Sequence, residues 1–226
     1  MNPRHLLTGL LALALSAAGG DVTGQAIITK RLTKKAIASP VYNLRGATPP
    51  AGPSDNAPVN EFESMVVMLE GGPGAPKASP ITATIDQRNS RFDPELLVIP
   101  VGSTVQFPNF DPIFHNVFSL SKTEPFDLGF YPRGKSRAVK FSRGGIVQVY
   151  CHIHANMYAA IVVTSSPWYG KPTADGSFSF TGVPEGHYRV VAWHKVAGLH
   201  HAEIDVAQTG TTEVTIHIPF DVEPRP

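Results

Sequence analysis

Short apolar segments recur at regular spacing between residues 81 and 163, and turn-forming residues separate each segment from the next. The segments are TATI, ELLVIP, STVQF, HNVFSL, RAVKF, GIVQVY and YAAIVV. This pattern is typical of a β-sandwich or β-barrel. The high content of glycine and proline, 20 and 21 of 226 residues, also favours many short strands over long helices. The sequence therefore predicts an all-β protein.

Further strands are expected on both sides of this central block. GSFSF, HYRVVAWH, AEIDV and EVTIHI follow it, and residues 25–29 and 65–70 precede it. The four later strands are too few to bury a sandwich core alone. We therefore expect the two flanking parts to form one small sandwich around the inserted central block, with residues 66–69 paired with or packed on residues 188–193. The alternative is an N-terminal extension packed on the central block, followed by a separate C-terminal unit.

The N-terminus predicts export. MNPRH precedes LLTGLLALALSAAGG, which gives the basic start, apolar run and small residues of a secretory signal peptide. The apolar run is short for a membrane span, so we expect cleavage between Ala17 and Gly20 and a periplasmic or extracellular protein without a membrane span. Removal of residues 1–20 takes away Arg4 and no acid, which leaves equal numbers of basic and acidic side chains. No basic stripe remains, so nucleic-acid binding is not expected.

Cys151 is the only cysteine of the chain, so it cannot form an intramolecular disulfide. In VQVYCHIHANMYAAIVV, residues 147–163, it is followed by His152, His154 and Met157 between two predicted strands. A buried thiol without a role is one explanation, and a metal ligand is the other. Thiolate suits Cu(I), imidazole suits both copper oxidation states, and a weak thioether tunes the reduction potential. The set favours copper, although zinc accepts the same donors.

A second histidine for such a site is available in NFDPIFHNVFSL, where His115 lies between a loop and a strand. Residues 81–164 resemble a cupredoxin of the plastocyanin and amicyanin type. RFDPELLVIPVGSTVQFPNFDPIFHNVFS resembles the stretch that leads to the first histidine ligand, and FSRGGIVQVYCHIHANMYAAIVV resembles the ligand loop with its flanking strands. The resemblance implies one mononuclear type 1 copper, cycling between Cu(I) and Cu(II), on His115, Cys151, His154 and the axial Met157.

The resemblance also assigns roles to two neighbours of the ligands. Asn116 resembles the family residue whose backbone or side chain steadies the thiolate sulfur. His152 would point away from Cys151 in an extended segment, so we expect a surface histidine there. YCHIH is similar to the His-Cys-His-Ile stretch of multicopper oxidases, but Tyr150 stands where the first histidine would be. The chain is therefore not expected to be an enzyme of that kind, or an enzyme at all.

The flanking parts resemble a second family. TADGSFSFTGVPEGHYRVVAWH resembles the second half of a transthyretin-like, carboxypeptidase-regulatory-like domain, and TGQAIIT and SMVVMLEGG resemble its first half. The expected fold is a cupredoxin Greek-key β-sandwich inserted in, or followed by, this small β-sandwich. The expected parts are the signal peptide (1–20), the first part of the flanking sandwich (21–70), a linker (71–80), the cupredoxin domain (81–166) and the second part of the flanking sandwich (167–222).

The tail carries a second histidine group. His194, His200 and His201 lie close in sequence, with His187 and His217 nearby. Since neighbouring residues of a strand point to opposite faces, His200 and His201 cannot both face one ion easily. The group could bind an accessory metal, or it could be a set of exposed, hydrogen-bonded histidines.

Three functions are consistent with these residues. The expected function is a one-electron carrier whose redox partners dock on a small apolar patch around His154, formed by Ile113, Phe114, Ala155 and Met157. The first alternative is a copper carrier, store or sensor without electron transfer. The second is a structural or adhesive β module with an accessory copper site.

Overall fold

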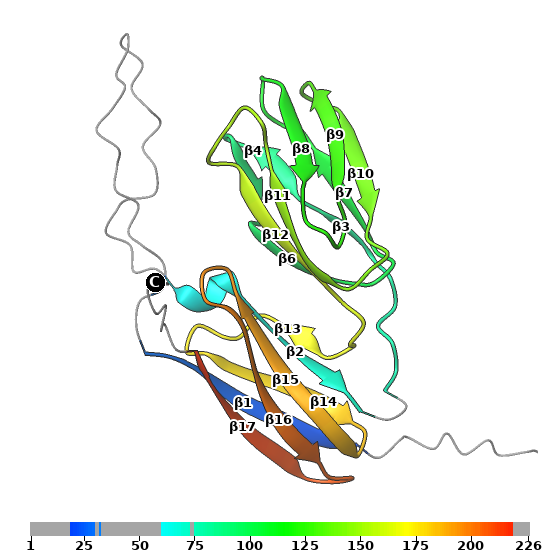
Figure 1. The fold of residues 1–226 in the computed structure, drawn as a ribbon, viewed down its shortest axis with the longest axis vertical. Helices are drawn as coiled ribbons and strands as arrows, with labels where there is room; N and C mark the ends of the chain where they lie inside the picture. Colours follow the sequence, from blue (N-terminus) through cyan, green and yellow to red (C-terminus); the bar gives the residue numbers. More distant parts are fainter. Residues whose placement is uncertain (1–18, 30–31, 33–59, 73–74, 219–226) are drawn as a thin grey trace, which may run out of the picture.

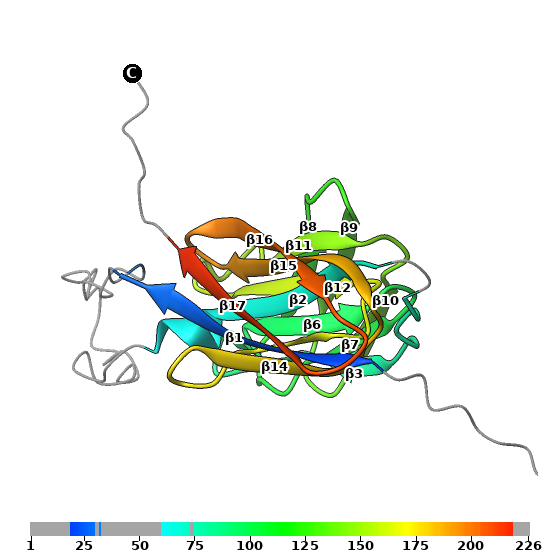
Figure 2. The same ribbon diagram turned by 90° about the horizontal axis from the view of Figure 1, so that it is seen from below.

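The computed structural model describes residues 19–29, 32, 60–72 and 75–218, and Figures 1 and 2 show the fold from two sides. Within this part the chain is all-β, as predicted, with a single turn of 3-10 helix, η1 (Glu61–Ser64). The predicted signal sequence lies outside the described residues up to residue 18. No helix of the described part is long and apolar enough to cross a membrane.

The central block forms a sandwich of two sheets, drawn in green in the upper half of Figure 1. One sheet has the strand order β6-β12-β11-β8-β9, and the other has the order β10-β7-β3. Their facing sides bury one apolar core, which includes Phe107, Phe141, Val149 and Ile161. The strands are β3 (Thr82–Thr84), β6 (Leu96–Pro100), β7 (Thr104–Pro108), β8 (His115–Ser119), β9 (Phe126–Tyr131), β10 (Ser136–Lys140), β11 (Gly145–Tyr150) and β12 (Tyr158–Thr164).

A short hairpin closes one end of this sandwich. It consists of β4 (Asp86–Arg88) and β5 (Arg91–Asp93), which pair antiparallel across Asn89 and Ser90. Both turn residues have positive φ, 55° and 54°, as a two-residue turn needs to follow the twist of its strands. The sequence analysis missed this hairpin and also β9, because their short segments are largely polar or interrupted by glycine.

The flanking segments form a second sandwich, drawn in the lower half of Figure 1. Its sheets have the orders β14-β1-β17 and β13-β2-β15-β16. Strand β1 lies between an antiparallel and a parallel neighbour, β14 and β17, and β2 lies between β13 and β15. The strands are β1 (Gly20–Ile28), β2 (Met65–Gly71), β13 (Tyr169–Gly170), β14 (Ser177–Val183), β15 (Gly186–His194), β16 (Gly198–Val206) and β17 (Thr211–Ile218).

Several predicted contacts of the flanking segments are present. Val66 is paired with Trp193 and Leu69 with Val190, so the expected pairing of β2 with the tail is confirmed. The two connections also run side by side, since the Ala78 N–H donates to the Ser165 carbonyl over 3.1 Å. The expected first strand at 25–29 is corrected to Gly20–Ile28. The first residues of β1 include glycines and do not look like a strand in the sequence, but they pair with neighbouring strands on both sides. The likeness of this unit to transthyretin stays a prediction.

The two sandwiches are stacked face to face. A third apolar cluster joins them, with Val66 and Met68 of β2, Val191 and Trp193 of β15, and Leu96, Ala160 and Val162 of β6 and β12. Alternate residues of β2, β15 and β12 point instead into the core of their own sandwich. Burial on both faces explains why MVVML, VVAW and AAIVV are continuous apolar runs rather than alternating ones.

Candidate metal centre

His115 is the first residue of β8 and lies at one end of the upper sandwich. Its side chain is fully buried, although histidine is more often found half exposed. Pairing with Tyr131 of β9 holds the backbone of His115 in the sheet. A buried imidazole at the rim of a sandwich needs partners for both ring nitrogens, and both have one.

The other two donors come from the loop between β11 and β12. Cys151 directly follows β11 and is buried, while His154 lies further along the loop and is half-buried. The Met157 N–H donates to the His154 carbonyl over 3.0 Å, which closes the loop into a turn. The loop thus holds a thiol and an imidazole against the ring of His115.

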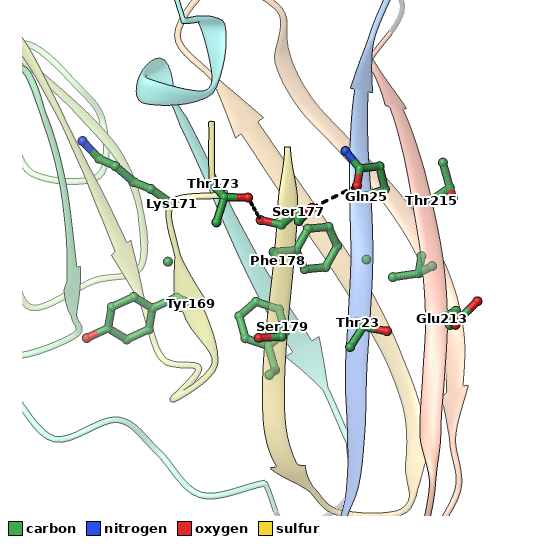
Figure 3. A pocket seen from close by; sticks show the side chains of 14 residues that line it. Thr23, Gln25, Tyr169, Lys171, Thr173, Ser177, Phe178, Ser179, Glu213 and Thr215 are labelled. Atoms are coloured by element: carbon green, nitrogen blue, oxygen red, sulfur yellow. Dashed lines mark hydrogen bonds between the residues drawn. The ribbon is translucent and has the colours of Figure 1, made fainter. Parts of the chain in front are cut away.

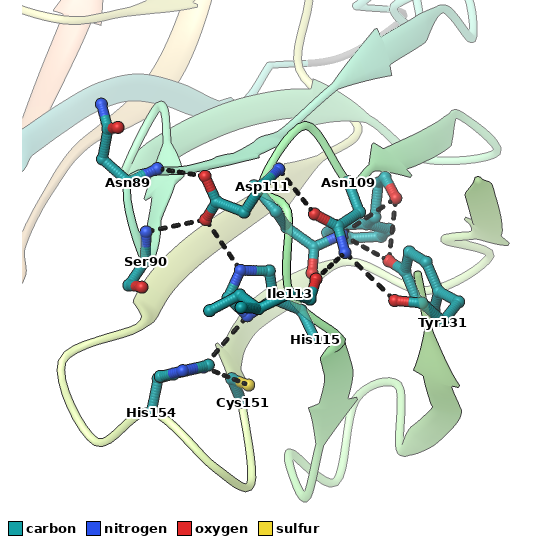
Figure 4. Close-up of polar contacts among 11 residues, drawn as sticks. Asn89, Ser90, Asn109, Asp111, Ile113, His115, Tyr131, Cys151 and His154 are labelled. Atoms are coloured by element: carbon teal, nitrogen blue, oxygen red, sulfur yellow. Dashed lines mark hydrogen bonds and ion pairs between the residues drawn. The ribbon is translucent and has the colours of Figure 1, made fainter. Parts of the chain in front are cut away.

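The three donor atoms lie at distances that fit one metal ion. Figure 4 shows His154 facing both His115 and Cys151. The two Nδ1 atoms of His115 and His154 are 3.0 Å apart, and Cys151 Sγ is 3.8 Å from Nδ1 of His154. Bonds of about 2.0–2.3 Å from one ion to nitrogen and sulfur place such donors about 3–4 Å apart. In the described part of the chain, these residues form the single group of three His, Cys, Asp or Glu side chains close enough to share an ion.

The far side of His115 is held by a carboxylate. Nε2 of His115 lies 2.8 Å from Oδ2 of Asp111, and this contact leaves Nδ1 as the nitrogen that faces the other donors. Burial by itself would raise the pKa of Asp111. Hydrogen bonds from the Ser90 N–H, from His115 and from the Asn89 N–H outweigh that effect and hold the pKa below its ordinary value.

The surroundings of His154 favour its neutral form. Loss of solvent around the ring lowers its pKa, the nearby His115 lowers it further, and Asp111 opposes both only in part. A neutral imidazole can coordinate a metal, whereas a protonated one cannot. The environment of His154 therefore favours the form that binds.

Met157, the expected axial ligand, is 1% exposed and belongs to the same apolar cluster as Cys151. It stands between the ligand loop and β12, as the sequence predicts. The expectation that Met157 contributes to the exposed apolar patch is wrong, because the side chain turns into the core. Its role as a ligand stays a prediction.

The patch itself is present without Met157. Ile113, Phe114 and Ile153 are about half exposed, and Ala155 is also exposed. Two of these residues lie in the loop that ends at His115, and two lie on either side of His154. Apolar side chains of these two loops therefore border the half-buried His154.

Asn116 and His152 link the ligand loop to the sheet. The His152 N–H donates to Oδ1 of Asn116 over 3.3 Å, and Nδ2 of Asn116 donates to Asp127 over 2.7 Å. The His152 ring stacks on Phe118 at 3.8 Å and lies 3.4 Å from a carboxylate oxygen of Asp127. His152 is thus the surface histidine expected from the sequence, and Asn116 acts on the backbone that follows Cys151.

The histidines of the tail do not gather around one point. His194 is fully buried, and its Nδ1 accepts hydrogen bonds from the Val196 and Ala197 N–H groups. The His187 ring lies between Asp205 and Glu203. His200 is half-buried while its neighbour His201 is exposed, as expected for opposite faces of β16. These contacts are hydrogen bonds and ion pairs rather than a ligand set.

A shallow groove of about 870 Å³ crosses the outer face of the β14-β1-β17 sheet (Figure 3). Its charged side chains are Lys171 and Glu213, and the remaining lining is mainly hydroxyl, amide and aromatic. Ser177 Oγ lies 3.1 Å from Oε1 of Gln25 across the groove. Its polar side chains thus contact one another, and the metal-type donors lie in the other sandwich.

Fold and site together define an all-β protein in which an eight-stranded two-sheet sandwich holds a His2Cys group at one end. No protein-family profile matches the chain, and no curated protein matches it. Among solved structures, it is similar to the copper-containing nitrite reductase from Thermus scotoductus SA-01 (28% identity, 42% of this chain and 25% of that chain, TM-score 0.36). It is also similar to a purple cupredoxin from Nitrosopumilus maritimus (24%, 36% and 99%, 0.34) and to amicyanin (19%, 42% and 87%, 0.34). The chain thus spans only a quarter of the nitrite reductase.

Sequence reasoning found the three donors but missed Asp111 and the turn that holds it. The signal was present, because Asp111 precedes His115 by four residues in the same quoted segment. A spacing of four residues predicts a side-chain contact in a helix but not in a loop, so only the folded structure shows that the two side chains meet. The contribution of the turn at 89–90 depends on positive φ values that the residue types Asn and Ser only permit.

Proposed function

We propose that the chain is an exported type 1 copper protein that carries single electrons between redox partners. The observation that carries the proposal is the convergence of one thiol and two imidazole Nδ1 atoms within 4.8 Å of one another at the rim of a rigid sandwich. Soft thiolate and borderline imidazole together suit both Cu(I) and Cu(II). A site that accepts both states without rearrangement can exchange an electron quickly.

The burial pattern supports electron transfer over storage. His115 is fully buried and Cys151 nearly so, while His154 alone of the three is half-buried. A store or carrier must release its ion, which favours exposed donors. Here an ion would have to leave past a single imidazole, whereas an electron can leave through the same ring without ligand loss.

The apolar border of His154 supports brief docking. Phe114 and Ile153 are 55% and 52% exposed, and small interfaces with few charges suit short-lived redox complexes. Without residues 1–20 the chain carries equal numbers of basic and acidic side chains, so long-range steering contributes little to association. We expect the partner to be a redox protein that approaches this edge. No catalytic step is assigned to the chain.

Repeated redox cycling in the presence of a copper chelator tests the proposal. The copper-loaded protein, with residues 1–20 removed, is reduced and reoxidised by small inorganic reagents while the chelator reports released copper. An electron carrier completes many cycles with full recovery of its oxidised spectrum and no transfer to the chelator. Loss of copper at each reduction would contradict electron transfer and favour storage. His201→Ala, which changes an exposed histidine of the other sandwich, is the matched control.

A further inference from the structure

Asp111 is the one buried carboxylate in the described part of the chain. It lies in the loop before β8, and among the described residues no lysine or arginine forms an ion pair with it. Its ionised form instead accepts three hydrogen bonds, two from backbone and one from His115 Nε2. A buried charge persists only where such partners compensate for lost water.

The structure builds this place for Asp111 from three separate segments. The Asn89 N–H donates to Oδ1 over 2.7 Å, and the Ser90 N–H donates to Oδ2 over 2.8 Å, both from the left-handed turn of the β4–β5 hairpin. The Asp111 N–H donates to Oδ1 of Asn109 over 2.9 Å. Asn109 is buried and donates in turn to the carbonyls of Ile113 and Tyr131 over 2.9 and 3.1 Å. Figure 4 shows the complete chain of contacts.

Besides its two backbone hydrogen bonds, the Asp111 carboxylate contacts the ring of His115, and this contact affects how His115 can bind a metal. An acceptor 2.8 Å from Nε2 keeps a proton on that nitrogen and fixes the ring plane, so the Nδ1 lone pair is directed at Cys151 and His154. A carboxylate does more than a neutral acceptor, because its negative charge makes the imidazole a stronger electron donor. Stronger donation favours the higher charge of an ion bound there.

We propose that Asp111 is a positioning residue that orients His115 through Nε2 and, by its charge, shifts the redox equilibrium of the bound copper toward Cu(II). The proposal rests on the proposed function, since it assumes copper at the three donors. Asp111 lies outside the set of proposed ligands. Its charge would change the reduction potential of the copper without changing any ligand. A purely structural Asp111 would instead only fasten the hairpin to the loop.

The test compares wild type with Asp111→Asn and uses Asp86→Asn as control. Asp86→Asn also removes one negative charge, from a half-buried aspartate of β4 whose side chain contacts Arg88 and not a proposed ligand. We expect Asp111→Asn to bind copper and to favour Cu(I) about tenfold more than wild type does, which is an upward shift of about 59 mV for a one-electron couple. The control should keep the wild-type potential. An unchanged or lower potential in folded, copper-loaded Asp111→Asn overturns the proposal.

Nitrogen-15 NMR of the copper-free wild type adds a readout that needs no variant. We expect the neutral ring of His115 to carry its proton on Nε2. A proton on Nδ1 overturns the proposal. Because this measurement uses the wild type, it tests the proposal even if Asp111→Asn does not fold. A wild-type protein that gives no thiolate-to-copper band overturns the proposed function and the proposal with it. A normal band with an unshifted potential in Asp111→Asn overturns the proposal alone.

Discussion

At the scale of single residues, Cys151 is the proposed ligand that no other side chain of the protein could replace. It is the only thiol of the chain and lies 3.8 Å from Nδ1 of His154. A thiolate supplies both the soft donor for Cu(I) and the charge-transfer absorption of a blue site. Cys151→Ser should abolish the intense visible band of the copper-loaded protein, as measured by absorption spectroscopy. The neighbouring His152→Ala is the control and should retain the band; a band that survives Cys151→Ser would refute the ligand assignment.

Met157 should tune the copper rather than hold it. The side chain is buried against the core that also contains Cys151. Met157→Gln should keep copper bound and lower the reduction potential, because an oxygen donor in place of sulfur favours Cu(II). Cyclic voltammetry measures the shift, and Met157→Leu separates the loss of the thioether from the change in packing. A potential equal to wild type in both variants would place Met157 in the core without any contact to the ion.

At the scale of elements, His194 fastens the end of β15 to its neighbours. Its Nδ1 accepts two backbone hydrogen bonds from the following turn, and its Nε2 lies 3.6 Å from Oε2 of Glu61 in η1. Burial lowers the pKa of His194, and Glu61 compensates only in part. The folded state therefore binds fewer protons than the unfolded state once the pH falls below about 6.5, the ordinary histidine value.

The resulting prediction concerns stability in acid. Between pH 7.5 and 5.5, the free energy of unfolding of the copper-free protein should fall, with His194 contributing at most about 1.4 kcal/mol per pH unit below pH 6.5. His194→Asn keeps an acceptor for the backbone N–H groups but cannot titrate, so its unfolding energy should fall less over the same range. Urea titrations at the two pH values measure both slopes. Equal slopes would show that His194 is not held neutral by the fold.

The elements also show how far sequence reasoning reaches. Apolar runs such as GIVQVY, YAAIVV and MVVMLE mark β11, β12 and β2 because core burial leaves a direct trace in residue type. The parallel pairs β1–β17 and β12–β6 left no such trace. The partners of these strands depend on contacts between residues far apart in the chain. The hairpin of Asp86–Arg88 and Arg91–Asp93 was missed for another reason, because it pairs through backbone and turn geometry and has few apolar residues.

At the scale of the whole molecule, the two sandwiches depend on different parts of the chain. All strands of the upper sandwich lie between residues 82 and 164, whereas the lower one needs β1 and β2 from before the insertion. A fragment of residues 79–166 should fold and bind copper. A fragment of residues 167–226 should not fold, because it lacks the strands that lie inside both of its sheets. Circular dichroism and thermal melting measure both, and a cooperative melt of the second fragment would contradict the split arrangement.

The contact between the sandwiches adds a qualification to the first fragment. Leu96, Ala160 and Val162 face Trp193 and its neighbours in the full chain. Their exposure in the isolated fragment should promote self-association at high concentration without disturbing the proposed copper site, whose donors lie outside this contact. Sedimentation velocity of the fragment and the full chain compares the two.

The central claim is that His115, Cys151 and His154 hold one copper ion in a type 1 site. The most direct measurement is the absorption and electron paramagnetic resonance spectrum of the protein, expressed without residues 1–20, after addition of one equivalent of Cu(II). We expect an intense visible thiolate-to-copper band and a narrow copper hyperfine splitting, both saturating at one copper per chain. A weak, broad band with the wide splitting of a copper bound by nitrogen and oxygen alone would contradict the claim.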